Sequence, residues 1–332
     1  METTLRPMQA AYVSPLMHSD LPCATVRVAE RTAQAKIKER DGWLHAKRED
    51  QQDQFKRMSI ATFHSALLLA PYYPCLWTLD KSPSVRARFD GGKWLCGLSE
   101  LSATRGAGGP CVVYSLGSNY DTKFEDHVSS STRGGCEFYI FDPTMGITGS
   151  PKRLAAWKSK LPRNYHFREV AITGDDSASA RTVNFTSVYG GGARAYPAST
   201  LEAAMRANGH AAGTILKFDI DGFEIELLRT TPWAHLRFGL LLFEVHPVQR
   251  KAGGGQRPLT FKAVHEAFVG LERAGYRMYS VEPVFIGPNG QGAGAFEVAF
   301  VHRDWSPQQG FSAPCPDLPV PPDKITSALI GR

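Results

Sequence analysis

Residues 213–228 read Gly213-Thr-Ile-Leu-Lys-Phe-Asp-Ile-Asp-Gly-Phe-Glu-Ile-Glu-Leu-Leu228, an apolar run that changes abruptly into acids, a glycine and a helical pattern. This order predicts a β-strand followed directly by a helix. An extended strand would place Asp219 and Asp221 on one side of the sheet, and Glu224 would open the helix. Parallel α/β sheets bind ligands at the carboxyl ends of their strands. The acids therefore indicate either a binding site or caps at the positive end of the helix.

Short apolar runs alternate with helix-like segments on both sides of this stretch. The runs predict strands at 111–116, 136–141, 168–172, 214–219 and 239–245. Helices are expected near 123–128, 151–160, 199–208, 222–228 and 261–273. Two further strands, 277–285 and 296–302, are joined by a Gly-rich loop short enough for an antiparallel hairpin. The pattern predicts an α/β fold with a seven-stranded, mostly parallel sheet and one antiparallel strand.

Composition divides the chain into three regions. Residues 1–92 form a helical N-terminal extension, in which 25–57 are predicted to be a solvated helix. Residues 93–305 carry the repeated strand and helix units, and 306–332 form a Pro-rich tail that we expect to be extended or disordered. The apolar residues that would pack the N-terminal helix on the main domain are Val28, Ile37, Trp43 and Leu44.

The overall composition is that of a globular protein, with 332 residues, 42% of them hydrophobic and 21% charged. The net charge of +6 comes from mixed charges, so no nucleic-acid partner is indicated. Residues 1–22 do not resemble a secretory signal and no apolar stretch is long enough to span a membrane, so we expect a cytoplasmic protein. Oligomeric state is not specified.

Six cysteines are present, and none is spaced as CxxC, so a zinc knuckle or a thioredoxin-like motif is not supported. Cys111 and Cys136 each begin an apolar run, which is typical of small buried side chains. An even count permits disulfide bonds in an oxidising compartment but does not require them.

Polar residues follow the first three predicted strands. Ser115 and Gly117 lie where the first strand turns, and a glycine there allows a close approach to a ligand. Asp142 follows the second strand, where an acid typically accepts hydrogen bonds from ribose hydroxyls, or else caps the next turn. Asp175 follows the third strand, near the place of an adenine, although Gly-Asp-Asp is also ordinary turn sequence. Neither GxGxxG nor GxxxxGK[ST] is present, which argues against nicotinamide enzymes and P-loop NTPases.

The fifth predicted strand ends in Phe243-Glu-Val-His246-Pro247. Glu244 and His246 would share one side of this strand, just as Asp219 and Asp221 would share one side of the neighbouring strand. A histidine titrates near neutral pH and suits proton removal from a hydroxyl group, although a lone histidine is often structural. Glu, His and two Asp are also a set that binds divalent ions, but we assign no metal at this stage.

Several of these segments together resemble the FkbM-type S-adenosylmethionine-dependent methyltransferases. Ile215-Leu-Lys-Phe-Asp-Ile-Asp-Gly-Phe-Glu224 is similar to the "LKxDxEGxE" signature of that family. The similarity to animal methyltransferase-like proteins of the group is carried by 110–119, Phe124-Glu125, 136–143 and 242–246. The matching segments stand in the right order over roughly residues 93–302.

The resemblance implies a Rossmann-like class I methyltransferase fold with S-adenosylmethionine at the ends of the first three strands. It implies that Ser115 and Gly117 lie near the amino-acid part of the cofactor, that Asp142 holds the ribose, that Asp175 lies near the adenine, and that Asp219 lies by the methyl donor. The sequence departs from the family at two positions. Ser115 stands where an acid is common, and Asp221 replaces a glutamate.

The leading hypothesis is methyl transfer from S-adenosylmethionine to an oxygen atom of a small or macromolecular acceptor. His246 or Asp219 is the candidate catalytic base, and Asp221, Glu224 and Glu244 lie next to the substrate or a metal. The alternative is a non-catalytic scaffold that keeps the fold, which the serine at position 115 motivates.

Overall fold

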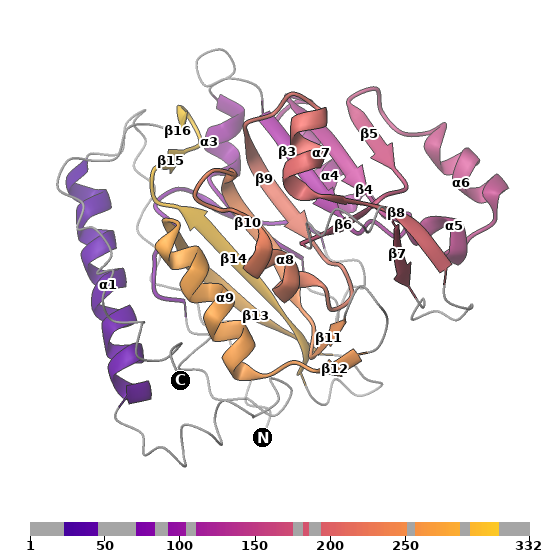
Figure 1. Cartoon of the computed structure of the whole chain (residues 1–332). Coiled ribbons are helices and arrows are strands. Elements are labelled where there is room, and N and C mark those ends of the chain that lie inside the picture. The colour runs from indigo at the N-terminus through magenta and orange to yellow at the C-terminus, as the bar shows by residue number, and fades with distance from the viewer. Residues whose placement is uncertain are drawn as a thin grey trace, which may run out of the picture.

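The computed structural model describes residues 23–45, 71–83, 92–103, 111–174, 182–185, 194–250, 256–285 and 293–311. Its centre is a seven-stranded sheet with the order β13-β14-β10-β9-β3-β4-β5 (Figure 1). Six strands run parallel, and β14 is antiparallel to both of its neighbours. The bounds are β3 Cys111–Leu116, β4 Cys136–Phe141, β5 Tyr165–Arg168, β9 Ala212–Phe218, β10 Arg237–Val245, β13 Tyr276–Phe285 and β14 Ala293–His302. The predicted mostly parallel sheet with one reversed strand is confirmed.

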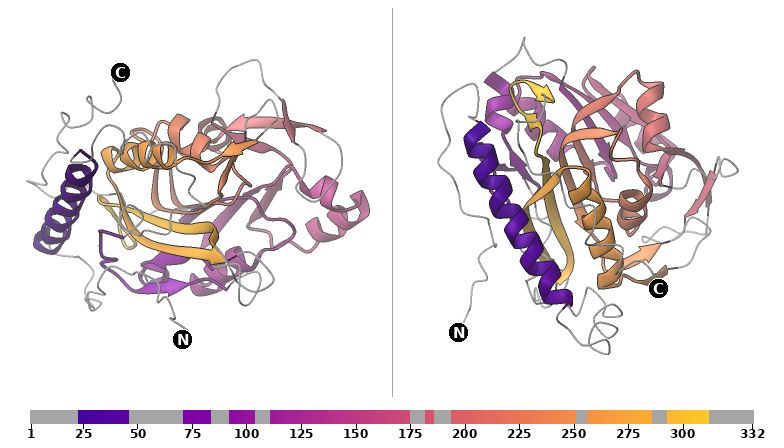
Figure 2. Two further views of the ribbon diagram at one scale, coloured as in Figure 1. Left: turned by 90° about the horizontal axis from the view of Figure 1, so that it is seen from below. Right: turned by 60° about the vertical axis from the view of Figure 1, so that its left-hand side comes forward.

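Helices lie on both faces of this sheet, so the molecule has three layers (Figure 2). One face carries α7, α8 and α9, and the other carries α3 and α4 (Figures 1 and 2). The bounds of the helices are α1 Cys23–His45, α3 Leu98–Ala103, α4 Lys123–Ser131, α5 Met145–Thr148, α6 Pro151–Lys158, α7 Leu201–Ala207, α8 Glu224–Thr230 and α9 Phe261–Arg273. Short strands outside the central sheet are β1 Leu79–Lys81, β2 Trp94–Cys96, β6 Ala171–Thr173, β7 Thr182–Phe185, β8 Arg194–Thr200, β11 Val248–Arg250, β12 Gln256–Pro258, β15 Trp305–Ser306 and β16 Gly310–Phe311.

The central strands form where the sequence has continuous apolar runs, because both of their faces are covered. In β10 every residue after Arg237 is buried, and its apolar side chains stack between those of β9 and β14. Phe243, for example, stacks on Phe218 and on Phe300, with ring centroids 4.7 and 5.9 Å apart. Helix α9 has the bounds expected from its apolar spacing, and Thr260 caps its N-terminus by accepting a hydrogen bond from the Ala263 amide.

The third predicted strand is wrong in its position. The sheet strand is β5, Tyr165–Arg168, which pairs with β4. The residues after it form β6, Ala171–Thr173, which belongs to a separate small sheet with β8 and β7. Apolar residues on both sides of Arg168 gave one continuous run in the sequence, and periodicity alone could not show that two strands divide it.

The N-terminal helix α1 lies beside α9 and β13 (Figures 1 and 2). Ile37 packs against the main core as predicted, but Val28 does not, because its side chain is 64% exposed. The buried face is instead formed by Val26, Ala29 and Ala33 with the charged Glu30. The predicted packing of Trp43 and Leu44 falls on side chains outside the described part of the structure. The helix is therefore tied to the domain through charge as well as apolar packing.

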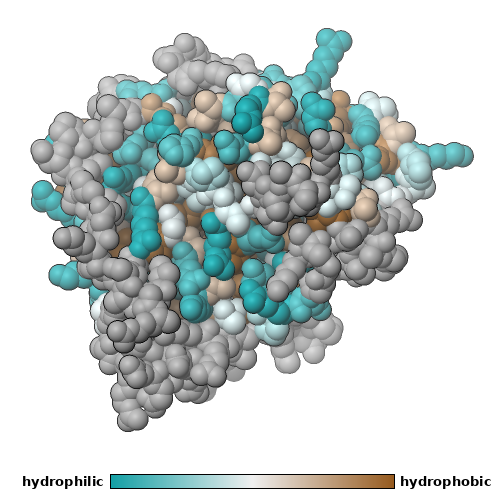
Figure 3. All heavy atoms as spheres, in the orientation of Figure 1, coloured by the Kyte–Doolittle hydropathy of each residue, from teal (hydrophilic) through white to brown (hydrophobic). Residues whose placement is uncertain are grey.

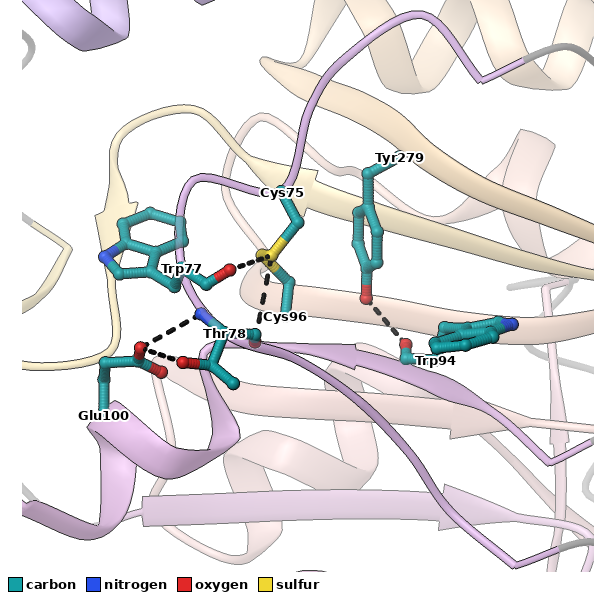
Figure 4. The surroundings of a disulfide bond; sticks show 7 residues. All are labelled: Cys75, Trp77, Thr78, Trp94, Cys96, Glu100 and Tyr279. Atoms are coloured by element: carbon teal, nitrogen blue, oxygen red, sulfur yellow. Dashed lines mark hydrogen bonds between the residues drawn. A yellow bond between two sulfur atoms is a disulfide. The ribbon is translucent and has the colours of Figure 1, made fainter. Parts of the chain in front are cut away.

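Two disulfide bonds lie entirely within the described ranges. Cys75 is bonded to Cys96 at the end of β2, next to Thr78, whose amide and hydroxyl donate to Glu100 (Figure 4). Cys111 is bonded to Cys136, which is its partner in the register of β3 and β4. Cys23 is also in a disulfide bond. None of the cysteines in the described ranges is free, so the pair at 111 and 136 is a cross-link and not simply buried thiols.

The drawn face of the molecule has the mostly polar surface that is typical of a globular protein. On the face drawn in Figure 3, hydrophilic and neutral side chains cover most of the described area, and apolar side chains show mainly between them. Within the described ranges, no helix combines the length and apolarity needed to cross a membrane.

Candidate functional site

The candidate site begins where β3 ends, at the point where the strand order reverses. The chain passes from β3 to β4 on one side, whereas β9 pairs with β3 on the other. Gly117 lies at this switch point with a φ of +83°, and its amide donates to the Phe141 carbonyl at 2.9 Å. A Cβ at this position would lie 1.9 Å from the carbonyl oxygen of Asp219. Only glycine therefore fits, and ligands of open α/β sheets bind at such points.

Asp142 connects the loops that follow β3 and β4. One carboxylate oxygen accepts from the amides of Ser118 and Asn119 at 2.9 and 2.7 Å. The other accepts from the amide and the hydroxyl of Thr144 at 2.8 and 2.7 Å. These four donors use the acceptor positions of the carboxylate, so Asp142 holds the two loops together in this structure. A ribose hydroxyl would have to displace one of the donors, and the ribose role stays a prediction.

Ser115 is completely buried, and its hydroxyl donates to the carboxylate of Glu125 in α4. Burial raises the pKa of Glu125, and the nearby Lys217 ammonium opposes that effect. Lys217 is the β9 partner of Ser115 in the sheet, and its ammonium donates to the Gly117 carbonyl. A carboxyl group therefore does lie beside position 115, but α4 supplies it. Lys217 thus connects the Ser115–Glu125 pair to the Gly117 turn.

The acidic motif is built as a turn and not as an extended strand. β9 ends at Phe218, and Asp221 has a φ of +52°, followed by Gly222 at +103°. The expectation that Asp219 and Asp221 share one side of a strand is therefore wrong. The turn is closed by Glu224, whose Oε1 accepts from the amides of Ile220 and Gly222 at 3.0 and 3.1 Å. Of the three acids, Glu224 therefore has the capping role. The side chains of Asp219 and Asp221 lie near His246 instead.

His246 follows β10 and is the point on which these acids converge. Its Nδ1 lies 3.0 Å from Glu224 Oε1. Its Nε2 lies 3.6 Å from Glu244 Oε1, 3.8 Å from Asp219 Oδ1 and 3.9 Å from Asp221 Oδ1. We call these five residues, Asp219, Asp221, Glu224, Glu244 and His246, the His246 cluster. The sequence-based expectation that they lie together is met.

A buried lysine lies behind the cluster. Glu244 of β10 stands directly opposite Glu297 of β14 in the antiparallel register. Like charges in this position repel each other. The ammonium of Lys93, which precedes β2, donates to both oxygens of Glu297 and lies 4.0 Å from Glu244 Oε2. Lys93 therefore offsets the repulsion.

The protonation states follow from burial and from these neighbours. Burial, the Asp219 charge and Glu297 raise the pKa of Glu244 to about 9. Burial opposes ionisation of Asp219, but Lys93, His246 and Lys217 outweigh it and lower the pKa. The pair Asp219 and Glu244 thus holds one proton at neutral pH. Burial also opposes charge on His246, but Glu224 and the other acids raise its pKa to about 10, so the ring is an imidazolium in the ligand-free state.

The structure brings together Ser115, Gly117 and Asp142 at one end of the site and the His246 cluster at the other, with Asp219 linking them. Asp175 lies outside the described residues. Glu125, Lys217 and Lys93 were not proposed from the sequence. Lys217 is two positions before Asp219, and that alternation could have indicated it. No local signal points to Lys93, because its partner is 204 positions away.

Comparison with known proteins finds one family model and several solved structures that are similar to this chain. A family model described as a methyltransferase domain matches residues 33–301. A search of curated proteins finds no match. Among solved structures, precorrin-6y C5,15-methyltransferase from Geobacter metallireducens is 9% identical, with a TM-score of 0.30 over 61% of this chain and 84% of that one. A putative rRNA methylase from Clostridium thermocellum is 12% identical, with a TM-score of 0.32 over 62% of this chain and 92% of that one.

Proposed function

This chain belongs to the methyltransferase-domain family and is an enzyme that depends on S-adenosylmethionine, and we propose that the cofactor binds at the switch point around Gly117 and that an acceptor oxygen receives the methyl group. The observation that carries the proposal is the convergence of Gly117, Asp142 and Asp219 at the carboxyl ends of three neighbouring strands. The FkbM type within this group stays a prediction.

The residues at this place fit such a cofactor. Gly117 leaves no side chain between its loop and the Asp219 backbone, so a ligand can approach the main chain closely. The partly exposed carboxylates of Asp219 and Asp221 provide negative charge for a sulfonium cation. The serine at position 115, which motivates the scaffold alternative, is accompanied by the carboxyl group of Glu125.

S-adenosylmethionine supplies a methyl group already activated on sulfur, so the protein mainly aligns the reactants and manages one proton. The acceptor oxygen forms a bond to the methyl carbon while the carbon–sulfur bond breaks and leaves its electron pair on sulfur. The acceptor hydroxyl gives its proton to the ionised carboxylate of Asp219, because His246 already carries a proton on both ring nitrogens. Asp219 lies between the Gly117 loop and His246, so we place the acceptor on the side of the His246 cluster, where a carboxylate can take the proton of a hydroxyl acceptor.

Calorimetry tests the cofactor assignment. Purified protein is titrated with S-adenosylmethionine and with S-adenosylhomocysteine, and the same titration is made with Asp142→Ala. The matched control is Glu137→Ala, which removes an exposed carboxylate from β4, the strand that precedes Asp142. We expect binding by the wild type and the control, and at least tenfold weaker binding by Asp142→Ala. Absence of binding by folded wild type, or unchanged binding by Asp142→Ala, would overturn the assignment.

The disulfide bonds bear on where the reaction takes place. Such bonds persist in oxidising compartments and are rare in the cytosol. Because the described cysteines are all paired, we propose an oxidising compartment in place of the predicted cytoplasmic location. Mass spectrometry of protein isolated from its source under thiol-blocking conditions tests this. Free thiols at Cys75, Cys96, Cys111 and Cys136 would contradict it.

A further inference from the structure

The His246 cluster gathers carboxylate and imidazole groups, which are common metal ligands, and ligand atoms of Asp219, Glu224 and His246 all lie within 4.8 Å of one another. Four carboxyl groups surround the imidazole. Lys93 is mainly paired with Glu297, since it donates to both oxygens of that carboxylate and lies 4.0 Å from Glu244, whereas Lys217 and Arg250 act on Asp219 and Asp221. Glu244 is only 5% exposed, so water screens the charges in this part of the cluster little. A compact group of acids of this kind attracts a further cation.

The ring of His246 is oriented toward the acids. Glu224 Oε1 is held by the amides of Ile220 and Gly222, and the Nδ1–H group of His246 donates to the same oxygen. Nε2 therefore faces Glu244, Asp219 and Asp221. A histidine whose second nitrogen donates to a fixed carboxylate is the usual arrangement behind a metal ligand, because that bond sets the tautomer and the direction of the free nitrogen.

The distances from Nε2 to the facing oxygens are compatible with a small ion. Nε2 lies 3.6, 3.8 and 3.9 Å from the three carboxylate oxygens. Ligand atoms bonded to one metal at about 2.1 Å are about 3.0–3.4 Å apart, so an ion would draw these side chains together by about half an ångström. Asp219 and Asp221 have side chains 32% and 49% exposed, which leaves a path from solvent.

We propose that His246 Nε2, Asp219, Asp221 and Glu244 bind a divalent transition-metal ion, with Glu224 as the residue that positions the histidine. One imidazole with several carboxylates favours manganese, iron or zinc over magnesium or calcium. The inference rests on the proposed function for its role: the ion would bind the acceptor oxygen and make its hydroxyl more acidic. His246 is then a ligand and not the base.

The four ligands come from segments that the fold fixes independently. Asp219 and Asp221 belong to the turn after β9, and Glu244 and His246 to the end of β10. Gly222 lets these segments meet, because a Cβ there would lie 2.8 Å from the carbonyl of Val248. The turn residue Asp221 has a left-handed backbone, and such backbone strain is common at binding sites. The cluster is therefore held in place before any ion arrives.

Manganese binding to the full chain tests the proposal. The protein is treated with EDTA, dialysed and titrated with Mn²⁺, and free Mn²⁺ is measured by electron paramagnetic resonance. We expect one tight site in the wild type, at least 100-fold weaker binding in His246→Ala and at least tenfold weaker binding in Asp221→Asn. Asp221→Asn keeps the fold, because asparagine tolerates a left-handed backbone. The matched control is His166→Ala, which removes another histidine paired with a carboxylate, 2.8 Å from Glu137 on the outer strands.

The outcomes separate this inference from the proposed function. Binding of S-adenosylhomocysteine is measured on the same samples with and without EDTA. Cofactor binding without a manganese site would overturn the metal site and leave the function standing. A manganese site with no cofactor binding would support the metal site and overturn the function. Equal Mn²⁺ affinity in wild type, His246→Ala and Asp221→Asn would place the ion elsewhere and overturn the proposal.

Discussion

The guanidinium of Arg277 in β13 donates to both carboxylate oxygens of Glu30 in α1, although 247 positions separate the two residues. Both side chains are almost completely buried. Arg303 lies 3.3 Å from the same carboxylate, and Arg277 also donates to the carbonyls of Glu272 and Tyr276 at 2.8 Å. The N-terminal helix is thus attached to the last strands of the sheet through a fully hydrogen-bonded ion pair.

Removal of one partner of this pair should be strongly destabilising. Glu30→Ala leaves the Arg277 charge buried without its partner, which typically costs about 3–5 kcal/mol. The double variant Glu30→Leu/Arg277→Met should lose less than Glu30→Ala alone, because the Arg277 charge is removed together with its partner and Arg303 keeps Asp304 at 3.7 Å. Urea denaturation followed by circular dichroism measures these differences. A double variant that is less stable than Glu30→Ala would contradict this account.

Gly117→Ala should abolish cofactor binding, because its Cβ would lie 1.9 Å from the Asp219 carbonyl. Gly134→Ala is the matched control. Gly134 has a similar φ of +71°, but a Cβ there meets nothing within 4 Å. Both variants carry the left-handed backbone strain of about 1–2 kcal/mol, so only the clash differs. Calorimetric titration with S-adenosylhomocysteine should show wild-type affinity for Gly134→Ala, and equal losses in both variants would refute the prediction.

Stability should fall in mild acid because of His302. Nε2 of this buried ring donates to the Ala274 carbonyl at 3.0 Å, and Nδ1 accepts from the Asp304 amide at 3.2 Å. The bond from the Asp304 amide requires the neutral ring, because a protonated Nδ1 has no lone pair with which to accept. Burial, and then the charges of Arg237, Arg303 and Arg277, lower the pKa of His302 to about 3 from an ordinary value of 6.5.

The unfolded chain therefore binds one more proton than the folded protein between these two pKa values. The stability due to the neutral ring is complete above pH 6.5 and declines as the pH falls toward 3. Between pH 7.5 and 5.0 the loss should be about 2 kcal/mol. Urea denaturation at both pH values measures it. His302→Gln should remove this part of the pH dependence, whereas the exposed His166→Gln should retain it.

Reduction of the disulfide bonds should destabilise the domain. Cys75–Cys96 and Cys111–Cys136 close loops with sequence separations of 21 and 25, and loops of this size are worth about 3 kcal/mol each through the unfolded state. Denaturation with and without a phosphine reductant measures the effect. The variant Cys111→Ala/Cys136→Ala should show a smaller further loss on reduction than the wild type. A midpoint that does not respond to reductant would contradict the cross-links.

The sequence was sufficient for the parts of the fold that depend on local periodicity. The buried strands β9 and β10 and the amphipathic helix α9 lie where the apolar pattern predicts them, because each buries a pattern of its own. The position of β5 could not be obtained in this way, since one apolar run there serves two different sheets.

The residues of the candidate site could be named from the sequence, but the turn and the ion pairs that hold them could not. Asp219, Asp221, Glu244 and His246 stand at strand ends, so topology alone brings them together. The turn that redirects Asp221 depends on the backbone of Gly222 and on Glu224, which no periodicity encodes. Lys93 and Glu297, or Arg277 and Glu30, meet through the tertiary fold, and a single sequence carries no sign of such pairs.

Residues that precede the central sheet in the sequence cover part of the edge of its outer strand, β13. The amides of Tyr72 and Tyr73 both donate to the Met278 carbonyl, at 3.2 and 3.1 Å. They occupy a backbone acceptor on the open side of β13, while α1 is anchored beside the same strand by Glu30. An uncovered edge is a template on which another polypeptide can add a strand. A molecule shortened to begin after Tyr73 would therefore leave this edge of β13 open, and its copies should associate by adding strands to one another.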